Sequence, residues 1–194
     1  MRMYAACLAS YNNGCLHGEW FDLEDYEGAA ELQRDIAIKV LRTSPHPNVT
    51  VVCPACGGSK PEQFFCMCCD KTGEVESAEE WAAHDWEGEG LSDFGEYPNL
   101  EEVFAHIRMV SEHGPAWVAF KSAFGDSATE ENFEEAYKGQ YDSEEAFAEE
   151  WTCEMHGWTG DEVFYRWIDW KQAWWSDLQH DFTFCDGYVF YSNW

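Results

Sequence analysis

Four cysteines in the first half of the chain have a spacing that is typical of metal ligands. Cys53 and Cys56 form one C-x-x-C pair, and Cys66 and Cys69 form a second pair nine residues further on. A C-x-x-C pair lets two thiolates bind one ion from a tight turn, and nearby glycines such as Gly57 let backbone amides turn toward the sulfurs. Two such pairs predict a closed, tetrahedral four-cysteine site for structural Zn²⁺.

The same segment leaves alternatives open. Cys68 is a spare thiol that replaces Cys66 or Cys69 in a second version of the ligand set. A redox C-x-x-C usually occurs singly at the start of a helix in a thioredoxin-like fold, which nothing in this chain indicates. Free thiols and an iron centre are the remaining alternatives. The segment also carries Lys60 and Lys71 and lies in the least acidic third of the chain. We expect it to stabilise its domain or to contact a partner.

The second group of residues with possible chemistry is the acidic stretch 126–157. Its apolar residues have helical spacing and predict two short helices, Ser127–Lys138 and Ser143–Met155, each packed on one side. With their caps they carry eleven carboxylates and one lysine, so the carboxylates must face water or a cationic partner. The predicted partner-binding carboxylates are Asp126, Glu130, Glu131, Glu134, Glu135, Asp142, Glu144, Glu145, Glu149, Glu150 and Glu154.

The net charge limits the kinds of partner. The chain has 38 acidic and 11 basic residues, a formal charge of −27. Residues 1–73 hold nine acids and six bases, whereas residues 74–194 hold twenty-nine acids and five bases. If residues 74–194 bound nucleic acid directly, two polyanions would have to be held together. The complex would then lack the favourable free energy that the release of counterions normally supplies. Basic proteins, cations and proteins that themselves bind nucleic acid are the expected partners.

A simple alternative is that the acidic residues form only a solvated surface, as in a salt-adapted protein. Salt adaptation should spread acid over the whole chain, and the uneven distribution of charge argues against it.

The composition predicts a folded protein without a membrane span. With 194 residues, 45% hydrophobic and 17% aromatic, the chain can bury a core. No apolar run approaches about 18 residues, and the N-terminus lacks a basic region followed by a long apolar core. We therefore expect a soluble protein of the cytoplasm, where the reducing conditions favour metal binding over disulfides.

Hydrophobic periodicity predicts an α+β arrangement near the N-terminus. The strands Met3–Ser10 and Cys15–Leu23 are expected to form a hairpin, to which the strand Glu79–Trp86 returns. A helix over Gly28–Thr43 and a short strand over Val49–Val52 complete this part.

Helices are predicted in the middle of the chain and a hairpin at its end. Helices Leu100–His113 and Ala116–Phe124 precede the two acidic helices. The second half of 161–178 is expected to be helical, and Phe182–Cys185 with Tyr188–Tyr191 to form a hairpin around an Asp-Gly turn. The predicted fold class is α+β, with three small domains: residues 1–90 (α+β, with the zinc-binding insert at about 45–76), residues 91–157 (acidic and helical) and residues 158–194 (α+β).

Other candidate residues do not assemble into a catalytic motif. The chain has no phosphate-binding glycine loop, no G-x-S-x-G and no H-E-x-x-H. A single His84-Asp85 pair lacks the further His and Asp residues of a phosphohydrolase. His106 and His113 are expected to be exposed. Four further cysteines are expected to fill apolar gaps, namely Cys7, Cys15, Cys153 and Cys185.

Several segments, in order, resemble the ArdA antirestriction proteins of plasmids, transposons and phages. The matching segments are YAACLASYNNGCLHGEWFDL, EEWAAHDWEGEGL, FGEYPNLEEV, FEEAYKGQYDSEEAFAEE, WIDWKQAWWSDL and DGYVFYSN. The resemblance implies an elongated three-domain protein that dimerises into a curved acidic rod. Such a protein looks like bent B-form DNA to type I restriction-modification enzymes, and the cysteine insert departs from the family pattern.

The resemblance implies that the protein is an inhibitor without catalytic residues. It also implies that the inhibitor acts in the cytoplasm of a bacterial host cell. It would occupy the DNA-binding groove formed by the methyltransferase and specificity subunits, and block restriction and, to a variable degree, modification. The alternative is a zinc-stabilised acidic adaptor that binds a basic host protein without imitating duplex geometry. An enzyme is not expected.

Overall fold

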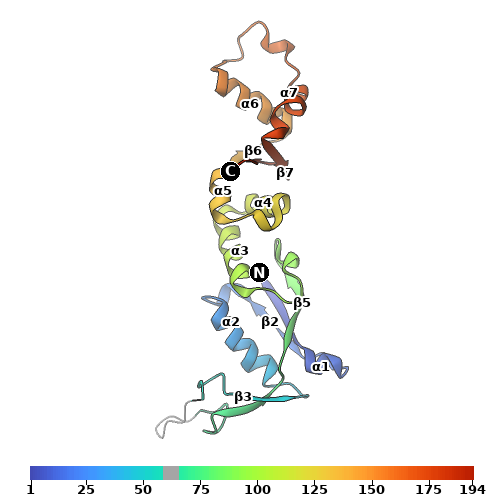
Figure 1. Cartoon of the computed structure of the whole chain (residues 1–194), viewed down its shortest axis with the longest axis vertical. Helices are drawn as coiled ribbons and strands as arrows, with labels where there is room; N and C mark the ends of the chain where they lie inside the picture. The colour runs from blue at the N-terminus through green and yellow to red at the C-terminus, as the bar shows by residue number, and fades with distance from the viewer. Residues whose placement is uncertain (59–65) are drawn as a thin grey trace. The chain divides into compact units, whose positions relative to one another are not determined.

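The computed structural model describes residues 1–58 and 66–194, which form two compact units, Met1–Arg108 and Met109–Trp194 (Figure 1). The described residues contain seven α-helices and eight strands in small sheets, so the mixed α and β content is as predicted. The three-domain division and the elongated shape stay predictions. No helix of the described residues combines the length and apolar character needed to cross a membrane.

The first unit is built on a three-stranded antiparallel sheet. Its strands are β1 (Arg2–Cys7), β2 (Gly18–Asp22) and β5 (Trp81–Glu87), in the order β2-β1-β5. Both β2 and β5 pair antiparallel with β1. The predicted hairpin and the return of the later strand are therefore confirmed.

A short helix, α1 (Leu8–Asn12), replaces the end of the strand that was predicted to reach Ser10. The sulfur of Cys7 accepts a hydrogen bond from the Ser10 backbone N–H at 3.4 Å and caps this helix. The Ser10 and Ser44 hydroxyl oxygens lie 2.9 Å apart, and both side chains are buried. These local polar contacts compete with the sheet ladder and end the strand early.

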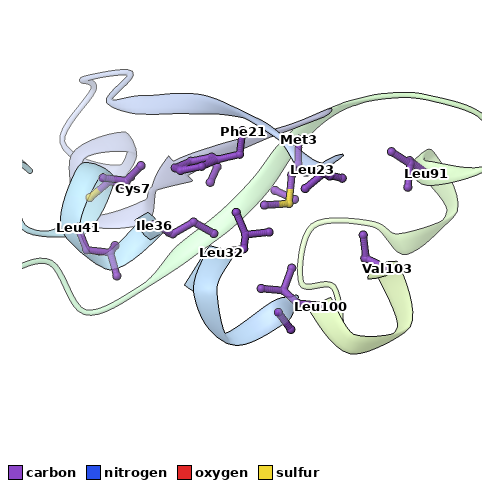
Figure 2. Packing of buried hydrophobic residues seen from close by; sticks show 14 of the residues in the cluster. Met3, Cys7, Phe21, Leu23, Leu32, Ile36, Leu41, Leu91, Leu100 and Val103 are labelled. Atoms are coloured by element: carbon purple, nitrogen blue, oxygen red, sulfur yellow. The ribbon is translucent and has the colours of Figure 1, made fainter. Parts of the chain in front are cut away.

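One helix covers the core of the first unit. It consists of α2 (Ala29–Ile36), which continues into a π-helical turn, η2 (Ala37–Leu41), where the prediction had one longer helix. Figure 2 shows Leu32 and Ile36 of this helix directed toward the sheet side chains, which include the buried Phe21.

The cysteine segment lies between two short strands of the first unit. These strands, β3 (Val49–Val52) and β4 (Glu74–Ser77), pair antiparallel with Val51 opposite Val75. β3 has the predicted bounds, whereas β4 was not predicted because it alternates acidic residues with only one large apolar residue. The hairpin thus brings the two ends of the cysteine segment together.

The second unit combines helices with a second three-stranded sheet, of order β6-β8-β7. Asp186 and Gly187 connect β7 to β8 with φ of 49° and 84°, the left-handed values of a type I′ turn, as the Asp-Gly pair predicts. Helix α3 (Leu100–His113) precedes the elements of this unit. They are α4 (Pro115–Phe124), α5 (Glu130–Ala136), β6 (Tyr137–Gln140), α6 (Glu144–His156), α7 (Trp170–Ser176), β7 (Phe182–Cys185) and β8 (Tyr188–Tyr191).

The first acidic helix is shorter than predicted. Thr129 caps it, so it begins at Glu130, and it ends at Ala136. The prediction that it continues to Lys138 was wrong, because β6 begins at Tyr137 and pairs with β8. The pairing is with a strand some fifty residues later, a long-range contact that local periodicity does not report.

Aromatic side chains form two buried clusters in the second unit. The first centres on Phe120, whose ring lies 5.3 Å from that of Phe133 and 5.2 Å from that of Phe190. The second centres on Phe147, whose ring lies 4.9 Å from that of Phe182. Each pair adds edge-to-face or tilted ring contacts to the apolar area buried.

His106 is buried, and the prediction that it is exposed was wrong. Its side chain is 3% exposed, and Nε2 lies 2.8 Å from the backbone oxygen of Glu89. Its ring lies 5.5 Å from that of Phe94. Burial of a polar side chain costs little free energy when that side chain has a hydrogen-bond partner. His106 can therefore lie on the buried side of α3 beside the apolar residues of the helix. His113 is half-buried.

We predict that Phe147→Ala lowers the free energy of unfolding by about 3–5 kcal/mol, because it leaves a cavity in an aromatic core. Phe147 is 0% exposed, and Trp151 stacks on it at 5.7 Å. Urea unfolding followed by tryptophan fluorescence measures the change. The control is Leu16→Ala, at a residue that is 69% exposed, which should change stability by less than about 0.5 kcal/mol. Equal stability of the two variants would contradict this core.

Candidate functional site

The four paired cysteines lie together in the first unit. One ligand atom from each of Cys53, Cys56, Cys66 and Cys69 lies within 4.8 Å of all the others. The Sγ atoms of Cys53 and Cys66 are 3.8 Å apart, and those of Cys56 and Cys69 are 3.7 Å apart. A tetrahedral ion with Zn–S bonds of about 2.3 Å requires sulfur–sulfur distances of about 3.8 Å. The cluster therefore has the size of a four-thiolate metal site.

Backbone hydrogen bonds position the two pairs. The Cys53 N–H, directly after β3, donates to the Gly73 carbonyl at 2.8 Å and so ties the start of the first pair to the end of the second. Within the turns, Gly57 N–H donates to the Cys53 carbonyl at 2.8 Å, and Thr72 N–H donates to the Cys69 carbonyl at 2.9 Å. Residues 59–65, among them Lys60 noted above, lie outside the described part of the chain.

Left-handed residues follow each pair. Gly57 and Gly58 have φ of 60° and 75°, and Asp70 and Lys71 have φ of 47° and 68°. Glycine at position 58 is favoured by its left-handed conformation, and a Cβ atom there would make a tight contact of 3.0 Å with Cγ1 of Val52. These turns direct the sulfurs of both pairs toward one point.

The electrostatics of the cluster favour a bound cation. Burial acts to raise the pKa of Cys53, but the backbone N–H groups of Cys56 and Ala55 outweigh it and lower this pKa to about 6. Burial and the neighbouring Cys53 thiol raise the pKa of Cys56 to about 12. Thiolates at these distances repel one another, so all four can be deprotonated together only around a positive ion.

Cys68 lies beside the cluster without joining it. Among the described residues, the group that converges contains Cys66 and Cys69 and leaves Cys68 out. Burial, followed by a hydrogen bond to Cys53, raises the pKa of the Cys68 thiol to about 11. The charge of Arg42 acts on Cys68, and the buried Nε of Arg42 has no hydrogen-bond partner in the described structure. A four-thiolate site with a divalent ion carries net negative charge, which this guanidinium would offset.

The structure places the predicted partner-binding carboxylates on the second unit, mostly at its surface. Asp126 lies in a 3₁₀ turn, Asp142 lies before α6, and the rest lie on α5 and α6. Only Glu144, Glu145 and Glu149 are half-buried, and the other eight side chains are exposed.

Two of these carboxylates accept hydrogen bonds from tyrosine hydroxyl groups. Tyr141 OH donates to Glu150 at 3.3 Å, and Tyr165 OH donates to Glu149. Lys138 donates to the backbone carbonyl of Glu135 and not to a carboxylate. In the described chain, no carboxylate of α6 forms an ion pair, so the helix presents its negative charge to solvent.

A second acidic surface lies in the first unit and was not among the predicted site residues. Residues 74–102 hold eleven carboxylates, all exposed, on and between β4 and β5, in the segment that leads into α3 and in the first turn of α3. One of them, Glu87, pairs with Arg2 at 2.7 Å. Counting charge along the chain would have found this surface, because residues 74–108 contain one basic residue. The first unit accordingly has net charge −13 and the second −14.

The fold and the site define a small, acidic protein of mixed α and β structure with a cluster of four cysteines. The chain belongs to the ArdA antirestriction family, because the family model described as antirestriction protein (ArdA) matches residues 3–190. A search of curated proteins finds no match. The family implies an antirestriction function, the inhibition of restriction-modification enzymes, and is not known for enzymatic activity.

We predict that the purified chain binds one divalent metal ion, and that Cys66→Ser loses it while Cys68→Ser keeps it. Cys66 belongs to the converging group and Cys68 does not. Elemental analysis gives the identity and stoichiometry of the ion. A chelator should increase proteolysis between β3 and β4 before it affects the second unit, since metal binding supplies much of the folding energy of such sites. Metal retained by Cys66→Ser and lost by Cys68→Ser would reassign the ligands.

Proposed function

We propose that this chain is a DNA-mimicking antirestriction protein. It competes with DNA for the binding groove of type I restriction-modification enzymes, formed by the methyltransferase and specificity subunits. The proposal rests on membership of the ArdA family and on one observation, the exposed carboxylates of α5 and α6. Restriction is blocked by occupancy of the groove, and modification requires the same groove.

Carboxylates can replace phosphates in a groove that binds DNA. Lysine and arginine side chains hold phosphate oxygens by charge-assisted hydrogen bonds, and carboxylate oxygens accept the same bonds. Duplex DNA carries one charge per roughly 1.7 Å, so a surplus of 27 charges corresponds to about 45 Å of duplex, and a dimer to about twice that. The exposed carboxylates of residues 74–102 give the first unit an acidic surface of its own, which can accept the same bonds.

We also propose that the bound metal is Zn²⁺ with a structural role. Four thiolates in tetrahedral geometry are typical of zinc, and all four positions are filled by protein ligands, so no site for catalysis remains open. The ion would hold the β3–β4 hairpin, whose strands have four residues each.

A homodimer in the bacterial cytoplasm is the proposed form. Val163, Phe164 and Trp167 expose apolar side chains together in one segment of the second unit, with 76%, 48% and 78% of each exposed. Such groups usually mark an interface. Restriction-modification enzymes act on DNA that has entered the cell, which places their inhibitor in the same compartment.

The second candidate function is an acidic adaptor that holds a basic protein without imitating DNA. The cysteine hairpin favours it, because Met67 is 86% exposed in the second turn and Lys71 follows it, features that do not resemble a phosphate backbone. Competition separates the two. A mimic and a duplex with the recognition sequence exclude each other from a purified type I methyltransferase, whereas an adaptor allows a ternary complex.

We predict that Glu131→Lys, Glu134→Lys and Glu150→Lys together weaken inhibition of a type I enzyme by at least about a hundredfold. All three residues are exposed, so the fold should be kept, and each reversal adds repulsion against a cationic groove. Inhibition is measured as DNA cleavage against inhibitor concentration, with circular dichroism as the folding control.

The matched control reverses three exposed acids of the first 73 residues, Glu19, Asp22 and Asp25, with the same change in net charge. It should weaken inhibition far less. Equal effects of the two triple variants would mean that net charge alone, and not the surface of α5 and α6, determines inhibition.

A further inference from the structure

A pocket of about 340 Å³ lies against α6 in the second unit. One wall is a stripe of α6 at helical spacing, which includes Glu149, Glu150 and Cys153. The other lining residues, among them Trp158 and Tyr165, come from the segment that connects α6 to α7. Figure 1 shows the path of that segment. The pocket therefore has carboxylates on one side and aromatic rings on the other.

Hydrogen bonds hold the aromatic wall in place. The carboxylate of Glu162 accepts from the backbone N–H groups of Thr159 at 3.1 Å and Gly160 at 2.9 Å, which lowers the pKa of Glu162 and keeps it ionised. Tyr165 donates its hydroxyl to Glu149 and so links the two walls. The ring of Tyr165 also lies 5.5 Å from that of Trp170, at the start of α7. The shape of the pocket is thus largely set before a ligand arrives.

The lining selects the charge of the ligand. Glu149 and Glu150 exclude an anion, and they lack a basic partner in the described chain. A divalent metal is disfavoured. Among the described residues, the group of three or more metal-binding side chains that converges is the cysteine cluster, and the carboxylates of this pocket do not belong to it. A monovalent organic cation remains.

The shape of the lining selects a planar cation. A guanidinium group stacks on the faces of tryptophan and tyrosine and donates paired hydrogen bonds to a carboxylate, whereas an ammonium group is compact and strongly hydrated. His156 stacks on one face of Trp158 at 4.7 Å, so the other face of Trp158 and the ring of Tyr165 would receive the guanidinium, and Glu149 and Glu150 would be the acceptors.

We infer that this pocket receives one arginine side chain of the target protein. The inference rests on the proposed function, because it names the group on the partner that the acidic surface anchors. Glu149 is half-buried there, so the pair is better shielded from water than those on the exposed face of α5. Exposed pairs contribute little individually, whereas an anchored arginine in a pocket has the character of a binding hot spot.

The first experiment titrates the isolated chain with acetyl-arginine amide and follows the indole N–H signals by NMR. The Trp158 signal, assigned with Trp158→Phe, should shift in a saturable manner, while that of Trp175, which does not line the pocket, should not. Acetyl-citrulline amide, a neutral analogue of the same shape, should give no shift. An equal response to citrulline or to acetyl-lysine amide, or no response to arginine, would overturn the inference.

The second experiment measures binding to a purified type I methyltransferase. Trp158→Ala and Glu149→Gln should each weaken the affinity about tenfold, since the first removes an aromatic ring of the pocket and the second removes a negative charge. Trp175→Ala, at a residue that is 51% exposed and outside the pocket, is the control and should leave the affinity unchanged.

The two proposals fail in different ways. If duplex DNA and the chain exclude each other but the pocket variants bind the methyltransferase as tightly as the unchanged chain, the arginine site is refuted. The proposal of DNA mimicry is then kept. If arginine amide binds the pocket but DNA and the chain bind the methyltransferase together, mimicry is wrong and the pocket stands.

Discussion

Mutual repulsion among negative side chains is the constraint on which the rest of this structure depends. A formal charge of −27 on 194 residues favours an expanded chain, and the fold must outweigh that tendency. It does so with dense aromatic cores, such as the cluster of Phe120, Phe133 and Phe190, and by keeping nearly all carboxylates at the surface. Because few cations neutralise them, the carboxylates remain available to a partner. The charge thus destabilises the folded chain, and under the proposed function it would stabilise a complex with a cationic groove.

Repulsion between negative charges also acts within the cysteine cluster, at shorter distances. Two four-residue strands make a hairpin that is marginal by itself. Four sulfurs within 4.8 Å repel one another when ionised. A divalent cation bound among them would attract all four and stabilise the hairpin. The buried guanidinium nitrogen of Arg42, without a hydrogen-bond partner in the described chain, adds positive charge next to Cys68. A small, less acidic part of the molecule can therefore fold with a very small apolar core.

Local signals in the sequence predicted local structure well. The Asp186-Gly187 turn and the C-x-x-C pairs are specified by neighbouring residues, and the structure confirms the hairpin and the convergence of the cysteines. Features that depend on distant residues were missed. Strand β6 exists because β8 pairs with it, and His106 is buried because the Glu89 carbonyl satisfies its ring nitrogen. The pocket beside Glu149 was not predictable either, since tertiary structure brings its aromatic wall to α6. Most carboxylates of residues 74–102 lie on strands and loops, where no helical periodicity indicates a shared face.

The most direct test of the account is the structure of the chain bound to a type I methyltransferase with its specificity subunit. The account predicts that the carboxylates of α5 and α6 lie in the groove, opposite the lysine and arginine side chains that hold phosphates in the DNA complex of the same enzyme. A complex in which the chain binds elsewhere and the groove stays open to DNA would contradict it.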